Sequence, residues 1–286
     1  MKSKLLRTEN GVSFIELIIA MAILAILLAA LYRVLGSQQR IYNIEDQVVD
    51  MQQNLRWSIT KMVEKIRMAG YGGNILDAFG DVNGFTSIIT PVRNLNNVGT
   101  ADDSITVIMA DEVSVLTQNA AEGSRSLRVK DGHSIFDTGA KKYLCLNGEN
   151  NYLVERVSGA TVTLADPLEE DHLTNETVSL VKAITYKLQW SNTNSIIMPL
   201  LTVDENTGEG SQVIADGIEK LHFSYTLSDG TVTDLPTAPE NIRMVKVHIT
   251  ARTKIPDSQM PGDRYRRRDL YDSILVRNLG LSSGDK

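Results

Sequence analysis

Residues 11–35 read GVSFIELIIAMAILAILLAALYRVL, and this segment constrains every interpretation of the chain. Between residues 17 and 32 no side chain is charged or strongly polar. Counted from Val12, the apolar segment is about 20 residues long, and at about 1.5 Å per residue a helix of that length can cross a bilayer. The segment therefore predicts a membrane-spanning helix.

The flanks of this segment predict its orientation. Three basic residues precede it: Lys2, Lys4 and Arg7. Because positive charges stay on the cytoplasmic side, the N-terminus is expected in the cytoplasm and the chain from Arg33 onward outside. A secretory signal peptide would end in a cleavage site of the Ala-x-Ala kind, and residues 28–33, LAALYR, fit that pattern poorly.

One residue of the segment does not suit a simple membrane anchor. Glu16 puts a carboxylate into an apolar helix, which costs about 2.5–3.5 kcal/mol at the bilayer centre and less near the interface. A plain signal anchor does not explain a residue with that cost. Glu16 is therefore a candidate functional residue.

The residues around Glu16, Gly-Val-Ser-Phe-Ile-Glu-Leu at positions 11–17, resemble the type III signal sequence of type IV prepilins and pseudopilins. The resemblance implies that a membrane aspartyl peptidase, the prepilin peptidase, cuts between Gly11 and Val12 and N-methylates Val12. Glu16 then becomes the fifth mature residue, which is the hallmark glutamate of that family.

A physical role for Glu16 follows from this processing. Cleavage creates an α-amino cation on Val12, at a helix start in lipid or in a filament core. The Glu16 carboxylate can neutralise that cation on a neighbouring subunit, and it lies where the helix dipole favours negative charge. We expect Glu16 to be an assembly contact that sets the register of incoming subunits. The alternative is a glutamate that reaches the lipid headgroups.

Two positions depart from the family pattern. Val12 stands where phenylalanine is usual, and Arg33 stands at the twenty-second mature position, where major pilins usually have proline. The first proline of the chain is Pro91. We therefore expect no proline kink in the helix, whose one weak point is Gly36.

Beyond the membrane segment the apolar residues become periodic, with steps of three or four residues, which is typical of an amphipathic helix. The apolar stripe consists of Ile41, Ile44, Val48, Met51, Leu55, Ile59, Met62 and Ile66. The glycine-rich residues 69–73, AGYGG, end the helix, which is expected from about residue 12 to about residue 68. As partner of the stripe, a β-sheet is favoured over a coiled coil because strand-like segments follow.

A longer stretch makes the resemblance more specific. Residues 51–57, MQQNLRW, and 65–72, KIRMAGYG, resemble PilW-type minor pilins, in which an Asn-Leu-Arg run precedes Ile-Arg-x-Ala-Gly-Tyr. Residues 274–278, ILVRN, resemble the closing strand of the same group. The resemblance implies a minor subunit of a type IV pilus rather than the bulk subunit.

The remainder of the chain alternates strand-like runs with turn residues and contains no second long helical pattern. The expected strands are residues 104–109, 113–117, 126–130, 142–146, 152–157, 161–165, 178–189, 195–200, 218–227 and 243–253. Short strands at this spacing predict antiparallel sheet and an α+β, pilin-like fold. Residues 178–189, 218–227 and 243–253 alternate best and are the predicted sheet under the stripe.

Four segments are expected along the chain. They are a leader peptide at residues 1–11, a transmembrane and assembly helix at 12–35, its amphipathic continuation at 36–70, and an extracytoplasmic β-rich domain at 71–286. Within the last, residues 124–183 have short strands with turns between them and predict a small all-β insertion.

Charge restricts the function classes. The chain has 286 residues, a net charge of -6 and a pI of about 5.3, which argues against general nucleic-acid binding. One basic run, residues 264–268, is interpreted as a solvated loop. The alternative is a DNA or surface contact through Arg264, Arg266, Arg267 and Arg268.

No catalytic constellation is recognisable, so no enzyme activity is expected. The lone cysteine, Cys145, predicts a buried apolar role and excludes a disulfide within the chain. His222 and His248 can meet across strands, as satisfied sheet histidines. Acidic groups occur at residues 102–103, 169–171 and 204–205. They lack the calcium-loop pattern, so no cofactor is expected, and calcium binding there is the alternative.

The expected function is that of a non-enzymatic minor pilin, which takes part in pilus assembly near the filament tip, with adhesion, motility and DNA uptake as downstream roles. The resemblance implies as partners the prepilin peptidase, other minor and major pilins, and the inner-membrane assembly platform; nucleic acid is not expected. It implies a single pass through the inner membrane and then the pilus. Two alternatives remain: a J-type pseudopilin of type II secretion, and a membrane-anchored extracytoplasmic binding protein or enzyme.

Overall fold

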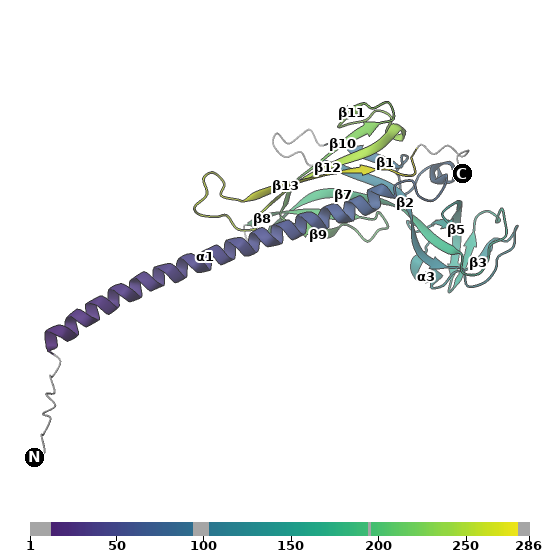
Figure 1. Ribbon diagram of the computed structural model, residues 1–286. Helices are drawn as coiled ribbons and strands as arrows, with labels where there is room; N and C mark the ends of the chain where they lie inside the picture. Colours follow the sequence, from purple (N-terminus) through teal and green to yellow (C-terminus); the bar gives the residue numbers. More distant parts are fainter. Residues whose placement is uncertain (1–12, 94–102, 194–195, 280–286) are drawn as a thin grey trace, which may run out of the picture. The chain divides into compact units, whose positions relative to one another are not determined.

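The computed structural model describes residues 13–93, 103–193 and 196–279 (Figure 1). A long helix, α1 (Phe14–Arg67), comes first and antiparallel sheets follow, so the predicted α+β, pilin-like fold is confirmed. The strands are β1 (Ile89–Val92), β2 (Ser104–Val115), β3 (Ser126–Arg128), β4 (Tyr143–Leu146), β5 (Asn150–Ser158), β6 (Thr161–Leu164), β7 (Thr177–Thr193), β8 (Ile196–Asp204), β9 (Gln212–Asp216), β10 (Ile218–Leu227), β11 (Val232–Thr233), β12 (Ile242–Arg252) and β13 (Arg267–Leu275). The short helices are α2 (Ile75–Phe79), α3 (Gly132–Ile135) and the 3-10 helix η1 (Pro239–Asn241).

Helix α1 is continuous over 54 residues, and Gly36 does not interrupt it. The chain forms two compact units, Met1–Val49 and Asp50–Lys286, and α1 contributes to both. In the first unit no residue of the predicted stripe is fully buried: Ile41 is 52% exposed, and Ile44 and Val48 are half-buried. In the second unit all residues of the stripe are buried, namely Met51, Leu55, Ile59, Met62 and Ile66. Ser58 is buried beside them. The prediction that the stripe packs on the β-domain therefore holds only from Met51 onward.

Two polar contacts fix the second half of α1 on strands of its own unit. The side-chain amide of Asn54 donates to the carbonyl and carboxylate oxygens of Asp216 on β9, at 3.1 and 2.7 Å. The hydroxyl of Tyr186 on β7 donates to the carbonyl oxygen of Lys61 at 3.3 Å. This part of the helix therefore lies along β9 and β7, as Figure 1 shows.

The strands form two sheets. A nine-stranded sheet has the order β1-β2-β7-β4-β5-β6-β3, with β8 paired to β7 and β9 paired to β8. A four-stranded sheet has the order β11-β10-β12-β13. The strands predicted to form one sheet under the helix belong to both, because β7 lies in the first and β10 and β12 lie in the second. This part of the prediction is wrong because alternation identifies a strand but not its pairing partner.

Other differences concern the limits of strands. Strand β2 is continuous where two strands were expected, at residues 104–109 and 113–117, and a register shift after Glu112 accommodates the polar break. Strands β1, β9 and β11 and most of β13 were not expected. The basic run is not simply a solvated loop, because Arg267 and Arg268 begin β13.

Strands β3 to β6 and the unexpected helix α3 lie around a hydrophobic core of their own, to which Val178 and Leu180 of β7 also contribute. Its large members include Leu127, Phe136, Leu144, Tyr152 and Leu164. Strand β4 pairs with β5 on one side and with β7 on the other, so this part is hydrogen-bonded into the nine-stranded sheet. The boundaries of an insertion at residues 124–183 stay a prediction.

Candidate functional site

The described part of the chain begins just after the predicted cleavage site. Gly11 and Val12 lie outside the described residues, so cleavage and methylation there stay predictions. The backbone N–H of Ser13 donates to Oε2 of Glu16 at 2.9 Å, and Ser13 Oγ accepts from the backbone N–H of Ile15 at 3.4 Å. Glu16 thereby makes the return bond of a capping box, while Ser13 caps the N–H of Ile15, so two free backbone N–H groups at the helix start are satisfied. The Ser-x-x-Glu pattern is the sequence signal that could have predicted it.

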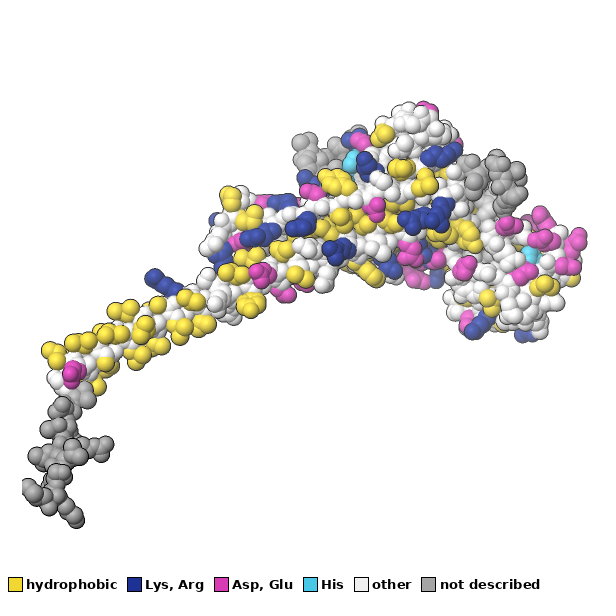
Figure 2. Space-filling model, in the orientation of Figure 1, with side chains coloured by type: hydrophobic (Ala, Val, Ile, Leu, Met, Phe, Trp, Pro, Cys, Tyr) yellow, Lys and Arg dark blue, Asp and Glu magenta, His cyan; other side chains and the backbone are white. Residues whose placement is uncertain are grey.

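Figure 2 shows the first half of α1 as an apolar surface with one acidic side chain near its start. The large apolar side chains from Phe14 to Leu35 are exposed in the chain alone. Of the described helices, α1 is the one that is long and apolar enough to cross a membrane. Such a surface is unstable in water and requires lipid or other apolar helices. Glu16 is exposed on it, so its carboxylate is accessible to a second chain.

Residues 54–71 dock the end of α1 on the nine-stranded sheet. After the helix, the N–H of Gly70 donates to the carbonyl of Ile108 on β2 at 2.9 Å. The N–H of Ala110, also on β2, donates to the carbonyl of Tyr71 at 2.7 Å. Asn54, in the same stretch, binds β9. The structure therefore gives these residues a role in the fold.

An ion cluster lies beside the end of α1. The Lys182 ammonium on β7, whose side chain is 8% exposed, lies 2.9 Å from Asp111 and 2.8 Å from Glu205. Lys65 of α1 approaches the other carboxylate oxygen of Asp111 at 2.9 Å. Burial alone would raise the pKa of Asp111, but hydrogen bonds from Lys65 and Lys182 outweigh burial and lower it. The cluster ties α1 to β2 and β7, and no sequence pattern pointed to it.

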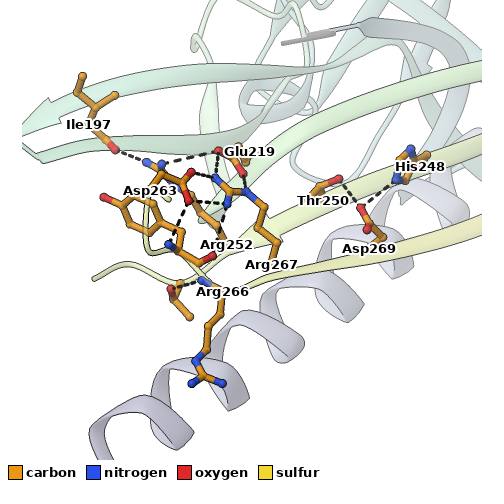
Figure 3. Close-up of polar contacts among 11 residues, drawn as sticks. Ile197, Glu219, His248, Thr250, Arg252, Asp263, Arg266, Arg267 and Asp269 are labelled. Carbon is orange, nitrogen blue, oxygen red and sulfur yellow. Dashed lines mark hydrogen bonds and ion pairs between the residues drawn. The ribbon is translucent and has the colours of Figure 1, made fainter. Parts of the chain in front are cut away.

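The arginines predicted as a surface contact lie in or beside the segment between β12 and β13, residues 253–266, which we call the arm. Figure 3 shows two of them, Arg266 and Arg267. Arg267 Nε donates to a carboxylate oxygen of Glu219 on β10 at 2.6 Å, and the same guanidinium pairs with Asp263. The hydrogen bond from Arg267 lowers the pKa of Asp263 to about 2. Arg267 is therefore occupied within the protein.

The remaining arginines differ from one another. Arg266 forms an ion pair of 2.9 Å with Asp257 inside the arm. In the part of the chain that the structure describes, no ion pair involves Arg264 or Arg268. Because carboxylates neutralise two of the four arginines, the structure does not bring all four together as one cationic surface.

The acidic groups accept hydrogen bonds from the protein itself. Asp103 accepts from Nδ1 of His222 at 2.6 Å, and Asp204 accepts from the hydroxyl of Ser211 at 3.0 Å. Asp102 lies outside the described residues. Within those residues, no group of three or more His, Cys, Asp or Glu side chains could hold a metal ion. The expectation that the protein holds no cofactor, with calcium as the alternative, therefore stays a prediction.

Two histidines and the cysteine are placed among residues of the sheets. His222 and His248 face each other on β10 and β12. His248 Nε2 lies 3.1 Å from a carboxylate oxygen of Asp269, and its ring stacks on Tyr271 with a centroid distance of 4.1 Å. Cys145 is fully buried, as predicted, and burial raises its pKa to about 12, so it is not a nucleophile at neutral pH.

The comparisons with known proteins bear on the N-terminus. Residues 6–32 match a family model described as the prokaryotic N-terminal methylation motif. No curated protein and no solved structure matches the chain. The matched residues contain Gly11, Val12 and Glu16 and extend over the apolar start of α1. The motif and the apolar helix together support a membrane-anchored, type IV pilin-like protein, which a prepilin peptidase processes and which assembles with other pilins.

Proposed function

We propose that this chain is a minor pilin of a type IV pilus, with α1 first as its membrane anchor and then as its assembly helix. The observation that carries the proposal is the N-terminal methylation motif at the start of a continuous 54-residue helix. The first half of that helix has an exposed apolar surface, and its second half is packed into a β-rich domain. This combination serves a structural subunit rather than an enzyme.

Three features favour a minor subunit over the bulk subunit. Helix α1 contains no proline and stays unbroken at Gly36. Cys145 is the one cysteine of the chain and is buried, so no disulfide closes a loop of the domain. The stretch at residues 54–71 resembles PilW-type minor pilins, and this resemblance also favours a pilus over a secretion pseudopilus.

Glu16 is the assembly contact in this proposal. In the free chain its carboxylate accepts a hydrogen bond from the backbone of Ser13. In the filament, the α-amino group of Val12 on a neighbouring subunit becomes its partner. A charge pair in an apolar surrounding is favourable only when both partners are present and well placed, so the pair selects one register of assembly.

Mass spectrometry of the N-terminal peptide tests the first step. Protein purified from its native host is expected to begin at Val12 with an N-methyl group. A chain that retains Met1 would exclude prepilin processing and favour a simple membrane anchor.

Deletion of the gene distinguishes a pilus subunit from a subunit of a secretion pseudopilus. We expect surface pili to be lost and then restored by complementation, while protein export through the type II system continues. The opposite result, intact pili with blocked export, would identify a J-type pseudopilin instead.

A further inference from the structure

Basic residues are concentrated near the C-terminal end of the chain. Residues 242–275, which contain β12, the arm and β13, have eight Lys and Arg against four Asp and Glu, in a chain of net charge -6. The cations of this segment that carboxylates neutralise are Arg252, Lys254, Arg266 and Arg267. Lys246 on β12 and Lys220 on the neighbouring β10 are exposed, and neither forms an ion pair within the described residues. These two ammonium groups are therefore accessible to an anion from outside.

The register of the four-stranded sheet places both lysines on one face, beside a row of three rings. His222 on β10 lies opposite His248 on β12, which lies opposite Tyr271 on β13. Lys220 precedes His222 by two residues and Lys246 precedes His248 by two, and alternate residues of a strand share a face. Because β10 and β12 are antiparallel, one lysine lies on each side of the row. A polymer that crosses the rings along the strands therefore passes both cations.

Contacts within the sheet hold the outer two rings of this row. One carboxylate oxygen of Asp269 lies 3.1 Å from Nε2 of His248 and accepts from the hydroxyl of Thr250 at 2.6 Å, as Figure 3 shows. The ring of Tyr271 stacks on that of His248, with an interplanar angle of 12°. Tyr271 is nevertheless 61% exposed, and its hydroxyl has no hydrogen bond among the residues that the structure describes. The side of the Tyr271 ring that faces away from His248 is therefore open to a further ring.

We propose that this surface, which we call the ring platform, binds single-stranded nucleic acid; it consists of Lys220, His222, Lys246, His248 and Tyr271. Exposed rings and unpaired lysines on one face of a β-sheet are the combination that binds single strands, since bases stack on the rings and phosphates contact the cations. The net charge of the chain argues against nucleic-acid binding over its whole surface, whereas the ring platform is a local exception. The inference does not depend on the distinction between pilus and secretion.

The same residues favour a single strand over other anions. A lipid headgroup would use the two lysines but not the open side of the Tyr271 ring. A duplex stacks its bases on one another, so it offers no base to that ring. Asp269 adds an acceptor beside the ring, because its second carboxylate oxygen accepts no hydrogen bond within the described residues. That oxygen can accept from the exocyclic amine of cytosine.

Fluorescence anisotropy of a labelled oligonucleotide tests the ring platform. The full chain, in a non-ionic detergent, is titrated into fluorescein-labelled oligodeoxycytidylate of about 12 nucleotides, a length within the usual range of single-strand sites. We expect saturable binding, for which unlabelled oligodeoxycytidylate competes better than a DNA duplex of the same length or heparin. Absence of binding overturns the proposal. Equal competition by the duplex or by heparin also overturns it, because the surface would then attract polyanions in general.

Matched substitutions locate the contact. Tyr271→Ala should weaken binding about fivefold or more, whereas Tyr271→Phe keeps the ring and should bind like the wild type. Lys220→Gln combined with Lys246→Gln removes two phosphate contacts, so the slope of log K against log salt concentration should become shallower by about 1.4. Arg125→Gln combined with Lys130→Gln makes the same change of charge at exposed residues on either side of β3 and should leave the slope unchanged. Melting temperatures check that each variant is folded. Wild-type affinity in Tyr271→Ala, or equal slopes in the two double variants, contradicts binding at the ring platform.

Discussion

Glu16 has one partner in the free chain and a different one in the proposed filament. Glu16→Ala removes the carboxylate that neutralises the Val12 α-amino group of a neighbour. Because an uncompensated buried charge costs about 3–5 kcal/mol, the amount of this protein in sheared filaments should fall by more than about tenfold. The amount in the membrane fraction should not fall, since an apolar residue favours insertion. Immunoblots of the two fractions measure both effects.

Ser13→Ala is the matched control for Glu16→Ala. It removes the hydroxyl that accepts from the Ile15 N–H but keeps the Glu16 carboxylate. Since a helix cap contributes about 1 kcal/mol, incorporation should change by less than about fivefold. If Ser13→Ala is as defective as Glu16→Ala, the glutamate acts by capping the helix and not by pairing between subunits.

Lys182 carries a prediction about stability. Lys182→Ala leaves Asp111 and Glu205 without their shared cation, so the free energy of unfolding should fall by about 3–5 kcal/mol. The control is Lys61→Ala, because Lys61 is exposed and its pair with Glu64 spans 4.0 Å, which is worth about 0.5 kcal/mol or less. Urea denaturation of the full chain in detergent measures both. Equal losses would mean that the cluster does not stabilise the fold.

The same cluster predicts a pH dependence. The pKa of Asp111 is lowered in the folded protein, so its contribution is present above the ordinary value of 3.8 and is lost as pH falls through the lower folded value. Burial would lower the pKa of Lys182, but the hydrogen bonds that its ammonium donates to Glu205 and Asp111 outweigh burial and raise the pKa. The contribution of Lys182 to stability is therefore fully present below pH 10.5 and is lost as the pH rises through its higher folded pKa. The stability difference between wild type and Lys182→Ala should be constant near neutral pH and shrink below pH 3.8; a difference that persists in acid contradicts this.

At the scale of elements, the turn after α1 depends on a glycine. Gly73 has a φ of +69°, and a Cβ there would lie 2.5 Å from the carbonyl oxygen of Glu149. Gly80 has a similar φ of +74° but open space around it. Gly80→Ala should therefore cost only the conformational strain, about 1–2 kcal/mol, and Gly73→Ala about 1–3 kcal/mol more because the backbone must move. Urea denaturation measures both costs. If the two variants lose the same free energy of unfolding, the short distance between Gly73 and Glu149 adds nothing to the cost of a Cβ.

The elements that could be predicted from the sequence have local signals. Helix α1 has a period of three to four residues and a glycine-rich end, and both can be read without knowledge of the rest of the fold. Strand β9 has no such signal, since Val213 is exposed and Ala215 is the one buried apolar side chain in it. The ion cluster was equally unpredictable, because Lys65, Asp111 and Lys182 are far apart in the sequence.

The candidate sites also differ in whether the local sequence carries a signal for them. Glu16 stands out because a carboxylate in an apolar segment is costly wherever the chain folds. The prediction of a loop holds for Arg264 and Arg266 but not for Arg267 and Arg268, because β13 is an edge strand, where charged residues are tolerated and even protective.

At the scale of the whole molecule, the division between the two units falls inside α1. The large apolar side chains of the first unit are exposed from Phe14 to Leu35, whereas the second unit contains the buried residues of the two sheets and the buried part of the stripe. The first unit therefore requires an apolar environment, and the second has a core of its own.

A fragment of residues 38–286 should therefore fold in water without detergent. It lacks the membrane-spanning residues but keeps about three turns of α1 before Met51, so fraying of the helix end does not reach the buried stripe. We expect a single cooperative thermal transition by circular dichroism. A shorter fragment, 60–286, loses Met51, Leu55 and Ile59, each worth about 1.5–3 kcal/mol of burial, and should lose that cooperativity. If both fragments melt alike, the part of α1 before residue 60 is dispensable, and the burial of Met51, Leu55 and Ile59 does not hold the β-domain together.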